Sequence, residues 1–385
     1  MSDPPRVGAI DSIGVGMLGY AFMGKAHANA YRTLSYMTWP PPLLPRLVAV
    51  AGRDPDAVED ARDRYGFDTA FTDWRDLVSD DRWTLFDNSG PNALHGEPTI
   101  AGAQAGKHVI CEKPLGRDAY ESYEIWQRVA ATGVTHMCGF NYRFVPAIRL
   151  VREMIESGDL GEIRHFRARY LQSWATDAAL MTWRFERGQA GSGALGDLGA
   201  HIIDLGRYLV GEVGNVTGLT RTFIDTRAGS AVDVDDAFQA TVEFETGATG
   251  TLEASRLCPG RLNQLALEVN GSRGSISFDL ERLNELAVCR EEAREPGFQR
   301  ILVTEPHHPF MSFWWPPGHT IGWEHTFVHE LHHLLSAIAG TESITPHGAD
   351  FEDGYRAAEI CEAILRSNQS GQREALTYHG AGPSG

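Results

Sequence analysis

The sequence has little of three features that mark large classes of protein. Only five of its 385 residues are cysteine, and no two form a C-x-x-C pair, which argues against a disulfide framework or a cysteine-bound zinc site. No stretch reaches eighteen consecutive apolar residues, and the N-terminus lacks the basic and apolar regions of an export signal. Acidic residues (51) outnumber basic residues (34), which gives a net charge of -17 and would repel a nucleic-acid backbone or an anionic membrane. We therefore expect a cytoplasmic protein that binds a small molecule or another protein.

The length of the chain points to more than one domain. A domain of ordinary size holds about 100–200 residues, so 385 residues predict two domains, with three as the alternative. A change of pattern near residue 143 suggests a division into 1–143 and 144–385. No internal repeat is evident, and the last six residues, GAGPSG, have the composition of a flexible tail.

One stretch, GALGDLGAHIIDLGRY at 193–208, combines a helical pattern with a pair of polar residues. Apolar residues recur at steps of three and four, which predicts a helix with one face in the core. These residues are Leu195, Leu198, Ile202, Leu205 and Leu209. Asp197 and His201 would share another face, where the carboxylate could orient the imidazole for general acid–base chemistry. The alternative is a pair that only caps or solvates the helix.

Near the N-terminus, an apolar run at 13–18 enters a glycine-rich turn and a predicted helix at 22–32. Helix-start amides in this arrangement can bind a pyrophosphate. Two glycine registers overlap here, and the first consists of Gly14, Gly16 and Gly19. The second consists of Gly19, Ala21 and Gly24. We prefer the second, because it has the run at 13–18 as its strand, whereas the first would need AIDS at 9–12. An ordinary tight turn remains the alternative.

A second strand is predicted at 47–51, and its end decides which nucleotide fits. NAD-binding sites usually place a carboxylate there to bind the ribose hydroxyls. Here the position is Gly52, followed by Arg53, which suits a 2′-phosphate, while Asp54 could still turn toward a ribose. The sequence therefore leaves the cofactor as NAD(P), with NADP weakly preferred over NAD.

Helix and strand patterns alternate through the first 143 residues and predict a doubly wound parallel sheet of Rossmann type. We expect further helices at 56–65, 95–105 and 120–132 and further strands at 83–88, 108–111 and 135–140. Such sheets bind ligands beyond the carboxyl ends of their strands. Two of these ends carry SGPN at 89–92 and EKP at 112–114. Lys113 is therefore either a cation near a reacting oxygen or a charged turn residue.

Beyond residue 143 the pattern changes to runs in which every second residue is apolar. A helix at 146–157 precedes the predicted strands, which lie at 162–172, 216–225, 237–245, 250–255, 265–270, 274–279 and 285–290. Turn sequences such as Asn270-Gly271 join them. We predict an α/β domain with a large, mostly antiparallel open sheet. Its uncovered face predicts a homo-oligomer, a dimer or tetramer, that packs sheet to sheet.

The last part of the chain is predicted as two helices, at 326–339 and 351–367, and the first carries a metal-binding motif. His329, Glu330 and His333 fit H-E-x-x-H, in which two histidines on one helical face bind zinc. The preceding sequence has the pattern of a nucleotide-binding enzyme and not of a protease. We therefore expect no metal site.

Together these motifs resemble the glucose-fructose oxidoreductase and inositol dehydrogenase family (Gfo/Idh/MocA) over nearly the whole chain, and within it the levoglucosan dehydrogenase type. The segments that carry the resemblance are GYAFMGKAH at 19–27, PNALH at 91–95, CEKPLG at 111–116, SGALGDLGAH at 192–201 and FEDGYRA at 351–357. The sequence departs from the common pattern at Ala21, in place of the middle glycine, and at Gly52, in place of the acid.

The resemblance implies roles for individual residues. The catalytic set of the family maps onto Lys113, Asp197 and His201, and the Lys113-Pro114 bond is expected to be cis. Residues expected to bind the cofactor are Gly19, Ala21, Phe22, Met23, Gly24, Arg53, Pro91, Asn92, His95, Glu112 and Lys113. Residues expected to bind a sugar or polyol ring are Asn141, Arg143, Gln172, Trp174, Trp183, Arg184, Asp197 and His201.

The predicted activity is oxidation of a ring secondary alcohol of a sugar, anhydrosugar or inositol by NAD(P), in a cleft between the two domains. His201 would take the hydroxyl proton while hydride passes to the cofactor. Two alternatives stay open: a glycoside or inositol dehydrogenase of different regiospecificity, and a non-catalytic regulator that senses a sugar or nucleotide on the same fold. The complete set of lysine, aspartate and histidine argues against the regulator.

Overall fold

The computed structural model describes residues 10–176, 179–295 and 297–379; the tail at 380–385 lies outside the described residues. The chain packs as two compact units. One comprises the chain up to Glu112 with Gln127–Asn141 and Gly322–Phe351, and the other comprises Lys113–Trp126, Tyr142–Ile321 and the chain from Glu352. The boundary between the units therefore falls at several points of the sequence, whereas we expected a single boundary between residues 143 and 144. Segments distant in sequence return to complete each core. Lys113 falls in the same unit as Asp197 and His201.

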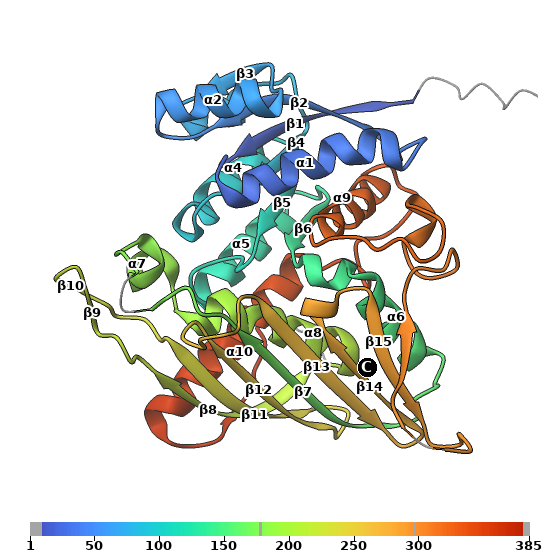
Figure 1. The fold of residues 1–385 in the computed structure, drawn as a ribbon. Helices are drawn as coiled ribbons and strands as arrows, with labels where there is room; N and C mark the ends of the chain where they lie inside the picture. The colour runs from blue at the N-terminus through green and yellow to red at the C-terminus, as the bar shows by residue number, and fades with distance from the viewer. Residues whose placement is uncertain (1–9, 177–178, 296, 380–385) are drawn as a thin grey trace, which may run out of the picture. The chain divides into compact units, whose positions relative to one another are not determined.

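The first unit is built on a six-stranded parallel sheet in the order β3-β2-β1-β4-β5-β6 (Figure 1). Its strands are β1 (Ser12–Leu18), β2 (Leu44–Ala51), β3 (Thr69–Phe71), β4 (Leu85–Asn88), β5 (His108–Glu112) and β6 (His136–Gly139). The helices between them in sequence are α1 (Phe22–Met37), α2 (Pro55–Tyr65), α3 (Trp74–Ser79), α4 (Gly96–Gln104) and α5 (Ala119–Ala130), and most of α5 belongs to the second unit. This strand order is that of the Rossmann fold, so the predicted doubly wound sheet is confirmed. The short β3 and α3 were not predicted.

Helix α9 (His325–Ile338) completes the first unit from a distant part of the sequence. It packs against α1, where the ring of Phe327 lies 5.6 Å from that of His27. Just before α9, Trp323 stacks on Phe22 with 5.4 Å between the ring centroids. Periodicity alone predicts the helix but not its partner, because the pattern of one helix carries no information about which surface will cover it.

The second unit is built on a nine-stranded sheet in the order β16-β15-β14-β13-β7-β12-β11-β8-β17. Its strands are β7 (Ile163–Leu171), β8 (Val213–Arg221), β11 (Ala237–Phe244), β12 (Thr249–Ser255), β13 (Gln264–Gly271), β14 (Gly274–Asp279), β15 (Glu285–Arg290), β16 (Gln299–Leu302) and β17 (Glu374–Ala375). β7 and β12 pair in parallel, and the other neighbours pair antiparallel. The predicted large, mostly antiparallel sheet is confirmed. A small hairpin, β9 (Thr226–Arg227) and β10 (Ser230–Ala231), forms a separate two-stranded sheet.

The two faces of the nine-stranded sheet differ. One face packs against α6 (Pro146–Glu156), α8 (Ala200–Val210) and α10 (Phe351–Ser370), as Figure 1 shows. A Cβ at Gly206 of α8 would lie 3.2 Å from the Phe166 ring, so helix and sheet are in close contact. The other face is a hollow of 680 Å³ lined by alternate strand residues such as Arg167, Thr241 and Glu253. None of the predicted site residues lines this hollow, so the candidate active site is elsewhere.

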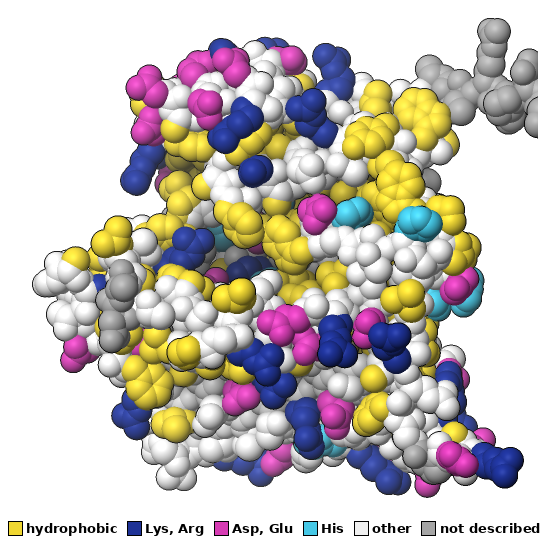
Figure 2. All heavy atoms as spheres, viewed as in Figure 1, with side chains coloured by type: hydrophobic (Ala, Val, Ile, Leu, Met, Phe, Trp, Pro, Cys, Tyr) yellow, Lys and Arg dark blue, Asp and Glu magenta, His cyan; other side chains and the backbone are white. Residues whose placement is uncertain are grey.

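Among the described residues, no helix has the length and apolar composition needed to cross a bilayer. On the face seen in Figure 2, acidic and basic side chains are interspersed. A nucleic-acid-binding protein usually gathers its basic residues into a patch or stripe. The charges on this face therefore give no support to a nucleic-acid partner.

Candidate active site

The residues around Asp197 form a π-helical turn, Leu195–Gly199, which leads into α8. The five apolar residues predicted to face the core are all buried. A π turn holds more residues per turn than an α-helix and is common at functional sites, so a spacing of four no longer places two side chains directly above one another. The described hydrogen bonds of the Asp197 carboxylate go to Lys113 and Arg256 and not to His201. Among the described residues, no hydrogen bond of Asp197 therefore orients His201, and the predicted influence of Asp197 on the imidazole rests on charge.

Asp235 fixes the start of this segment. Its carboxylate accepts hydrogen bonds from the amides of Gly193 at 2.7 Å and Leu195 at 2.8 Å, and its main-chain oxygen accepts one from Ala194 at 2.9 Å. The backbones approach so closely that a Cβ at Gly193 would lie 1.7 Å from the Asp235 oxygen. Only glycine fits there, and this contact sets the direction in which the turn carries Asp197.

Replacing Gly193 by alanine should lower the free energy of unfolding by about 1–3 kcal/mol, because one backbone must move to admit the methyl group. Gly188 is the matched control, since a Cβ there would meet no atom within 4 Å. G188A should keep or slightly raise Tm, because it restricts only the unfolded chain. Thermal denaturation compares the two variants, and a G193A protein that melts with the wild type would contradict the role of this contact.

Each carboxylate oxygen of Asp197 faces a cation. Oδ1 lies 3.5 Å from Nζ of Lys113, which also donates to the main-chain oxygen of Asp197 at 2.9 Å. Oδ2 accepts a hydrogen bond from Nη2 of Arg256 at 3.1 Å. Burial raises the pKa of Asp197, but the charges of Arg256, Lys113 and Arg184 outweigh burial and hold that pKa well below its usual range. Asp197 is therefore ionised at neutral pH.

His201 is 7% exposed and packs against the rings of Tyr142 and Tyr170, with centroids at 4.6 and 5.8 Å. Burial, and then the charge of Lys113, lower the pKa of His201 well below 6.5, while the charge of Asp197 acts in the opposite direction. The imidazole is therefore neutral at pH 7 and can accept a proton. Asp197 influences His201 through this charge.

Three of the predicted substrate-binding residues are connected to Asp197 through Arg256 or Arg184. Trp174 is 38% exposed, and its ring packs against the Phe185 ring at 5.5 Å and the Arg256 guanidinium at 5.1 Å. Trp183 and Arg184 belong to a short helical turn, Trp183–Phe185, in which the Arg184 guanidinium lies over the Trp183 ring. This segment therefore presents aromatic surface and a cation next to the charged cluster.

Gln172 reaches the same site through a chain of polar side chains. Its side-chain amide nitrogen, Nε2, donates to Oδ1 of Asn263 at 2.7 Å, and the hydroxyl of Tyr170 donates to the same oxygen at 2.7 Å. The Tyr170 hydroxyl also pairs with that of Tyr142 at 2.8 Å. Because both tyrosine rings pack against His201, this chain holds polar groups close to the imidazole.

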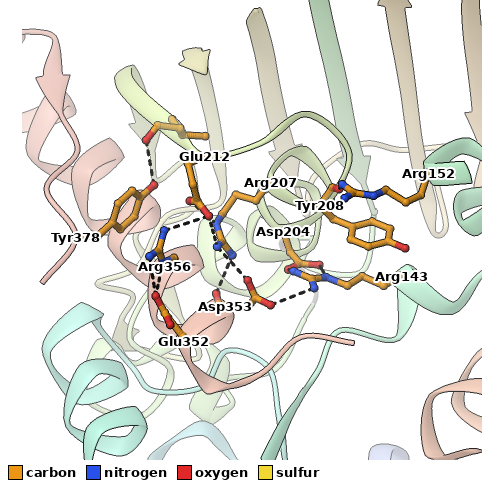
Figure 3. A network of polar contacts seen from close by, with 11 residues as sticks. Arg143, Arg152, Asp204, Arg207, Tyr208, Glu212, Glu352, Asp353, Arg356 and Tyr378 are labelled. Atoms are coloured by element: carbon orange, nitrogen blue, oxygen red, sulfur yellow. Dashed lines mark hydrogen bonds and ion pairs between the residues drawn. The ribbon is translucent and has the colours of Figure 1, made fainter. Parts of the chain in front are cut away.

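Asn141 and Arg143 are both buried and bonded to structural partners. Nδ2 of Asn141 donates to the hydroxyl of Thr326 at 2.9 Å. Arg143 donates from Nε and Nη2 to Asp204 and from Nη1 to Asp353, as Figure 3 shows. Burial opposes ionisation of Arg143, but these two carboxylates raise its pKa. The structure thus favours a structural role for both residues over the predicted contact with substrate.

The network of Figure 3 extends from Arg143 along α8 and α10. Arg207 binds Glu212 and Asp353, and Arg356 binds Glu212 and Glu352. Breaking a buried ion pair leaves a charge without compensation, which is strongly destabilising. This cluster fixes α8, and with it His201, to α10.

The glycine-rich turn falls on the second of the two registers. A Cβ at Gly16 would lie 2.4 Å from the buried ring of Trp83, so this glycine makes room for packing inside β1. Gly19 has φ of +99°, and α1 begins at Phe22 immediately after the turn. A Cβ at Gly24 would lie 2.3 Å from the main-chain oxygen of Gly19, so the helix packs directly on the turn.

The start of α1 fits a pyrophosphate group. Within the described residues, no side chain caps this end and no acidic residue stands in its first turn. Amides that lack a side-chain cap and face no negative charge are suited to an anion. A Cβ at Gly19 would lie 2.7 Å from the main-chain oxygen of Ser89, so only glycine lets the backbones approach this closely. Ala21 immediately precedes α1, and Met23 lies in its first turn.

The other predicted cofactor residues differ from one another in exposure and in their contacts. Arg53, past the end of β2, and Pro91 are exposed, and Asn92 is half-buried. His95 is 1% exposed, and its Nε2 lies 3.0 Å from the Gly90 oxygen, which fits support of the loop. The Lys113-Pro114 peptide bond is cis, as expected.

Glu112 points into the first unit. Its Oε1 lies 3.0 Å from Nε2 of His27, whose Nδ1 lies 2.9 Å from Asp87. Burial lowers the pKa of His27, but the two carboxylates outweigh burial and raise it well above 6.5. With a residue exposure of 4%, Glu112 is better explained as a partner of this imidazolium than as a ligand of a cofactor.

The H-E-x-x-H motif lies in α9, and its side chains have other partners. Nδ1 of His333 lies 2.8 Å from Glu342, and Nε2 lies 2.8 Å from the main-chain oxygen of Ile344. His329 and Glu330 are fully buried. Within the part of the chain that the structure describes, no group of three or more His, Cys, Asp or Glu side chains has the arrangement of a metal site.

Sequence reasoning missed four residues of the site: Tyr142, Tyr170, Arg256 and Asn263. The two tyrosines and Asn263 have no motif around them, and the strand pattern gave Tyr170 only a place in the core. Arg256 follows β12, where a charged residue is usually an exposed turn residue. Its 1% exposure is the unexpected feature, and only the three-dimensional structure reveals it.

Two family models match the chain. Residues 13–140 match the model described as an oxidoreductase family with an NAD-binding Rossmann fold, and residues 148–277 match the model of the GFO/IDH/MocA C-terminal domain. The first match covers β1 to β6, and the second contains the π-helical turn and α8.

Individual relatives are similar over almost the whole chain. Levoglucosan dehydrogenase of Pseudarthrobacter phenanthrenivorans is 40% identical over 380 residues, covering 93% of this chain and 96% of its own. Inositol 2-dehydrogenase of Rhizobium meliloti is 28% identical over 353 residues, covering 91% and 96%. A solved structure of levoglucosan dehydrogenase with NADH and levoglucosan has a TM-score of 0.92 at 40% identity, covering 95% of this chain and all of the other. An oxidoreductase domain protein from Kribbella flavida gives a TM-score of 0.92 at 40% identity, covering 96% and 100%.

Proposed function

Because the chain belongs to the Gfo/Idh/MocA oxidoreductase family, we propose that it oxidises a ring secondary alcohol of a sugar, anhydrosugar or inositol with NAD(P). The observation that carries this proposal is a buried, neutral His201 in the same cluster as Lys113 and an ionised Asp197. A neutral base, a nearby cation and a fixed negative charge are what removal of an alcohol proton requires. The similarity to levoglucosan dehydrogenase favours an anhydrosugar.

The proposed reaction divides the work among three residues. His201 accepts the hydroxyl proton of the substrate. The ammonium of Lys113 stabilises negative charge as it develops on the substrate oxygen. Asp197 holds that ammonium through its Oδ1 and its main-chain oxygen. A bound oxidised nicotinamide would supply the hydride acceptor for the carbon that bears this hydroxyl, so that the alcohol would become a ketone.

Trp174, Trp183 and Arg184 are the proposed binding surface for the sugar ring. Aromatic faces stack on the apolar C–H faces of a pyranose, and a guanidinium donates to its hydroxyls. The exposed part of Trp174 and its position beside the Asp197 cluster support this assignment. Gln172 adds a polar group from the Tyr170 side of His201.

For the cofactor, we infer that NADP is accepted together with NAD and is weakly preferred. Gly52 carries no side chain, and the ring of Tyr20 occupies the space next to it, 2.0 Å from where a Cβ would lie. The Asp54 carboxylate accepts a hydrogen bond from the Ala57 amide as the cap of α2, which leaves Arg53 as the charged group for the nucleotide. The relatives solved with NADH favour NAD, so the ratio of kcat/KM values for the two cofactors decides.

A cofactor-reduction screen tests the proposed function. Purified protein is mixed with levoglucosan, inositols and glycosides, each with NAD and with NADP, and absorbance at the reduced nicotinamide band is followed. We expect turnover with at least one ring alcohol, and most with an anhydrosugar. Turnover of inositols or glycosides alone would change the proposed substrate from an anhydrosugar to an inositol or a glycoside. Binding of cofactor without turnover of any of them would favour a sensor on the same fold.

We propose that the open face of the nine-stranded sheet pairs with a second copy of the chain. The face carries both basic and acidic residues, including Arg167, Arg169, Glu253 and Glu268, so two copies related by a two-fold axis can match unlike charges. Light scattering should therefore give a mass of at least twice the 42.3 kDa of one chain. A monomeric mass at micromolar concentration would contradict this prediction.

A further inference from the structure

Arg256 lies directly after β12 and is 1% exposed, although residues 257–267 contain no carboxylate to balance its charge. Its guanidinium makes three described hydrogen bonds: Nη2 to Oδ2 of Asp197 at 3.1 Å, Nη2 to the Gly193 oxygen at 2.9 Å, and Nη1 to the Arg184 oxygen at 3.3 Å. One side chain thereby connects the start of the π-helical turn, the carboxylate within that turn and the segment that carries Arg184.

Arg256 uses its hydrogen-bond donors less completely than a purely structural arginine could. Its Nε is buried and has no hydrogen-bond partner among the described residues, and a buried donor without a partner is destabilising. By contrast, Arg207 donates from both Nε and Nη2 to Glu212 and also binds Asp353. A well-packed apolar side chain is often at least as stable as a buried ion pair. A cation at position 256 is therefore better explained by its effect on Asp197.

We propose that Arg256 is a positioning residue for the dehydrogenase reaction. It keeps Asp197 ionised and fixes its Oδ2, so that Oδ1 and the main-chain oxygen remain directed at Lys113. This inference rests on the proposed function, since it assigns Arg256 a part in holding the Lys113 ammonium. Asp197 is the intermediary, because the described contacts of Arg256 do not include Lys113 or His201.

The groups that face Asp197 determine the expected pH dependence. Arg256, Lys113 and Arg184 lower its pKa, and His201 acts in the same direction, while burial raises it. Arg256 has the largest effect among these charges. Without it, burial raises the pKa of Asp197, and the carboxylate binds a proton at higher pH. An opposite charge at this distance shifts the pKa of an aspartate by about 1–3 units. Protonated Asp197 would no longer hold Lys113, so activity should be lost at a pH at which the wild type is still active.

The kinetic experiment compares R256Q, R256K and R207Q. The profile is measured for ketone reduction, in which His201 works in its protonated form and its own titration does not cause the loss of activity at acid pH. In R256Q, the acid limb that belongs to Asp197 should move up by about one pH unit or more, and kcat should fall. In R256K, which keeps the charge, the limb should stay near its wild-type position, although kcat falls because one ammonium cannot bind all three acceptors. R207Q removes a buried arginine from the same unit that does not touch Asp197, so Tm should fall without movement of the limb. A folded R256Q protein with the wild-type acid limb would overturn the proposal.

A second experiment needs no activity. Thermal denaturation of wild type, R256Q, D197N and the double variant gives the coupling between the two residues. If Arg256 acts on Asp197, R256Q should lower Tm less in the D197N background than in the wild type. Additive losses would show that Arg256 only supports the backbone. If R256Q alone does not fold, recovery of folding in R256Q/D197N supports the proposal, and failure of both overturns it.

These two readouts separate the inference from the proposed function. Coupled Tm values in a protein that turns over none of the ring alcohols would refute the dehydrogenase while leaving the Arg256–Asp197 pair intact. Turnover by the wild type with additive Tm values and an unmoved acid limb would refute the positioning role alone.

Discussion

Replacing His201 by alanine should lower kcat by about 10²- to 10⁴-fold, the usual contribution of a general base. Binding of the reduced cofactor, measured by its fluorescence, should change little, because the predicted pyrophosphate site lies at the start of α1. His308 provides a matched control: it is also buried, with a pKa lowered first by burial, and it bonds within its own turn to the Glu305 amide. H308A should keep wild-type turnover. Turnover by H201A at the wild-type level would show that His201 is not the general base.

The pH dependence of the wild type follows from the lowered pKa of His201. A base works in its deprotonated form, so alcohol oxidation should reach a plateau above this pKa and fall as the pH drops through it. Since the pKa lies below 6.5, the plateau should include pH 7. Ketone reduction needs the protonated imidazole and should therefore become faster toward acid pH. H201A should lose the acid limb that belongs to this group.

Replacing Lys113 by methionine should lower kcat by about 10²- to 10³-fold, the effect of removing one group that stabilises a developing oxyanion. Replacing Lys113 should also shift the pH profile in a definite direction. Lys113 lowers the pKa of both His201 and Asp197, so its removal should raise both. The acid limb of the K113M profile should therefore move to higher pH. Steady-state kinetics from about pH 5 to 9 measures both effects.

Lys107 is the control for Lys113, because it precedes β5 by one residue and Lys113 follows it by one. It is 3% exposed and donates to the main-chain oxygens of Asp80 and Trp83. K107M should lower Tm, since those oxygens lose their donor, while the folded enzyme keeps its pH profile. If K113M and K107M shifted the acid limb equally, the shift would not report the charge beside His201.

The elements that sequence pattern predicts well are those whose signal is local. Alternating strand and helix runs gave the Rossmann unit, and period-two runs gave the central strands of the nine-stranded sheet, to within a few residues. The prediction is weakest for the short elements β3, β16 and β17, which have too few residues to show a period. The second glycine register also followed from local pattern, because the strand before the turn is visible in the sequence.

The site was predicted less completely, because its side chains depend on distant partners. Lys113, Asp197 and His201 come from recognisable motifs and do cluster in one unit. Arg143 and Glu112 also stand in or beside motifs, yet each is turned toward a structural partner, Asp204 or His27. A motif records that a residue type matters, but it does not distinguish a residue that binds a ligand from one that supports its neighbours.

The sequence by itself determined the family, the two kinds of sheet and the identity of the three candidate catalytic residues. Tertiary structure alone decided which partners these residues have. The i, i+4 spacing of Asp197 and His201 suggested direct contact, but the π-helical turn directs the carboxylate to Lys113 and Arg256. The physical reason is that the hydrogen bonds and charges around a buried group come from strands and loops far along the chain, whereas spacing describes only its own helix.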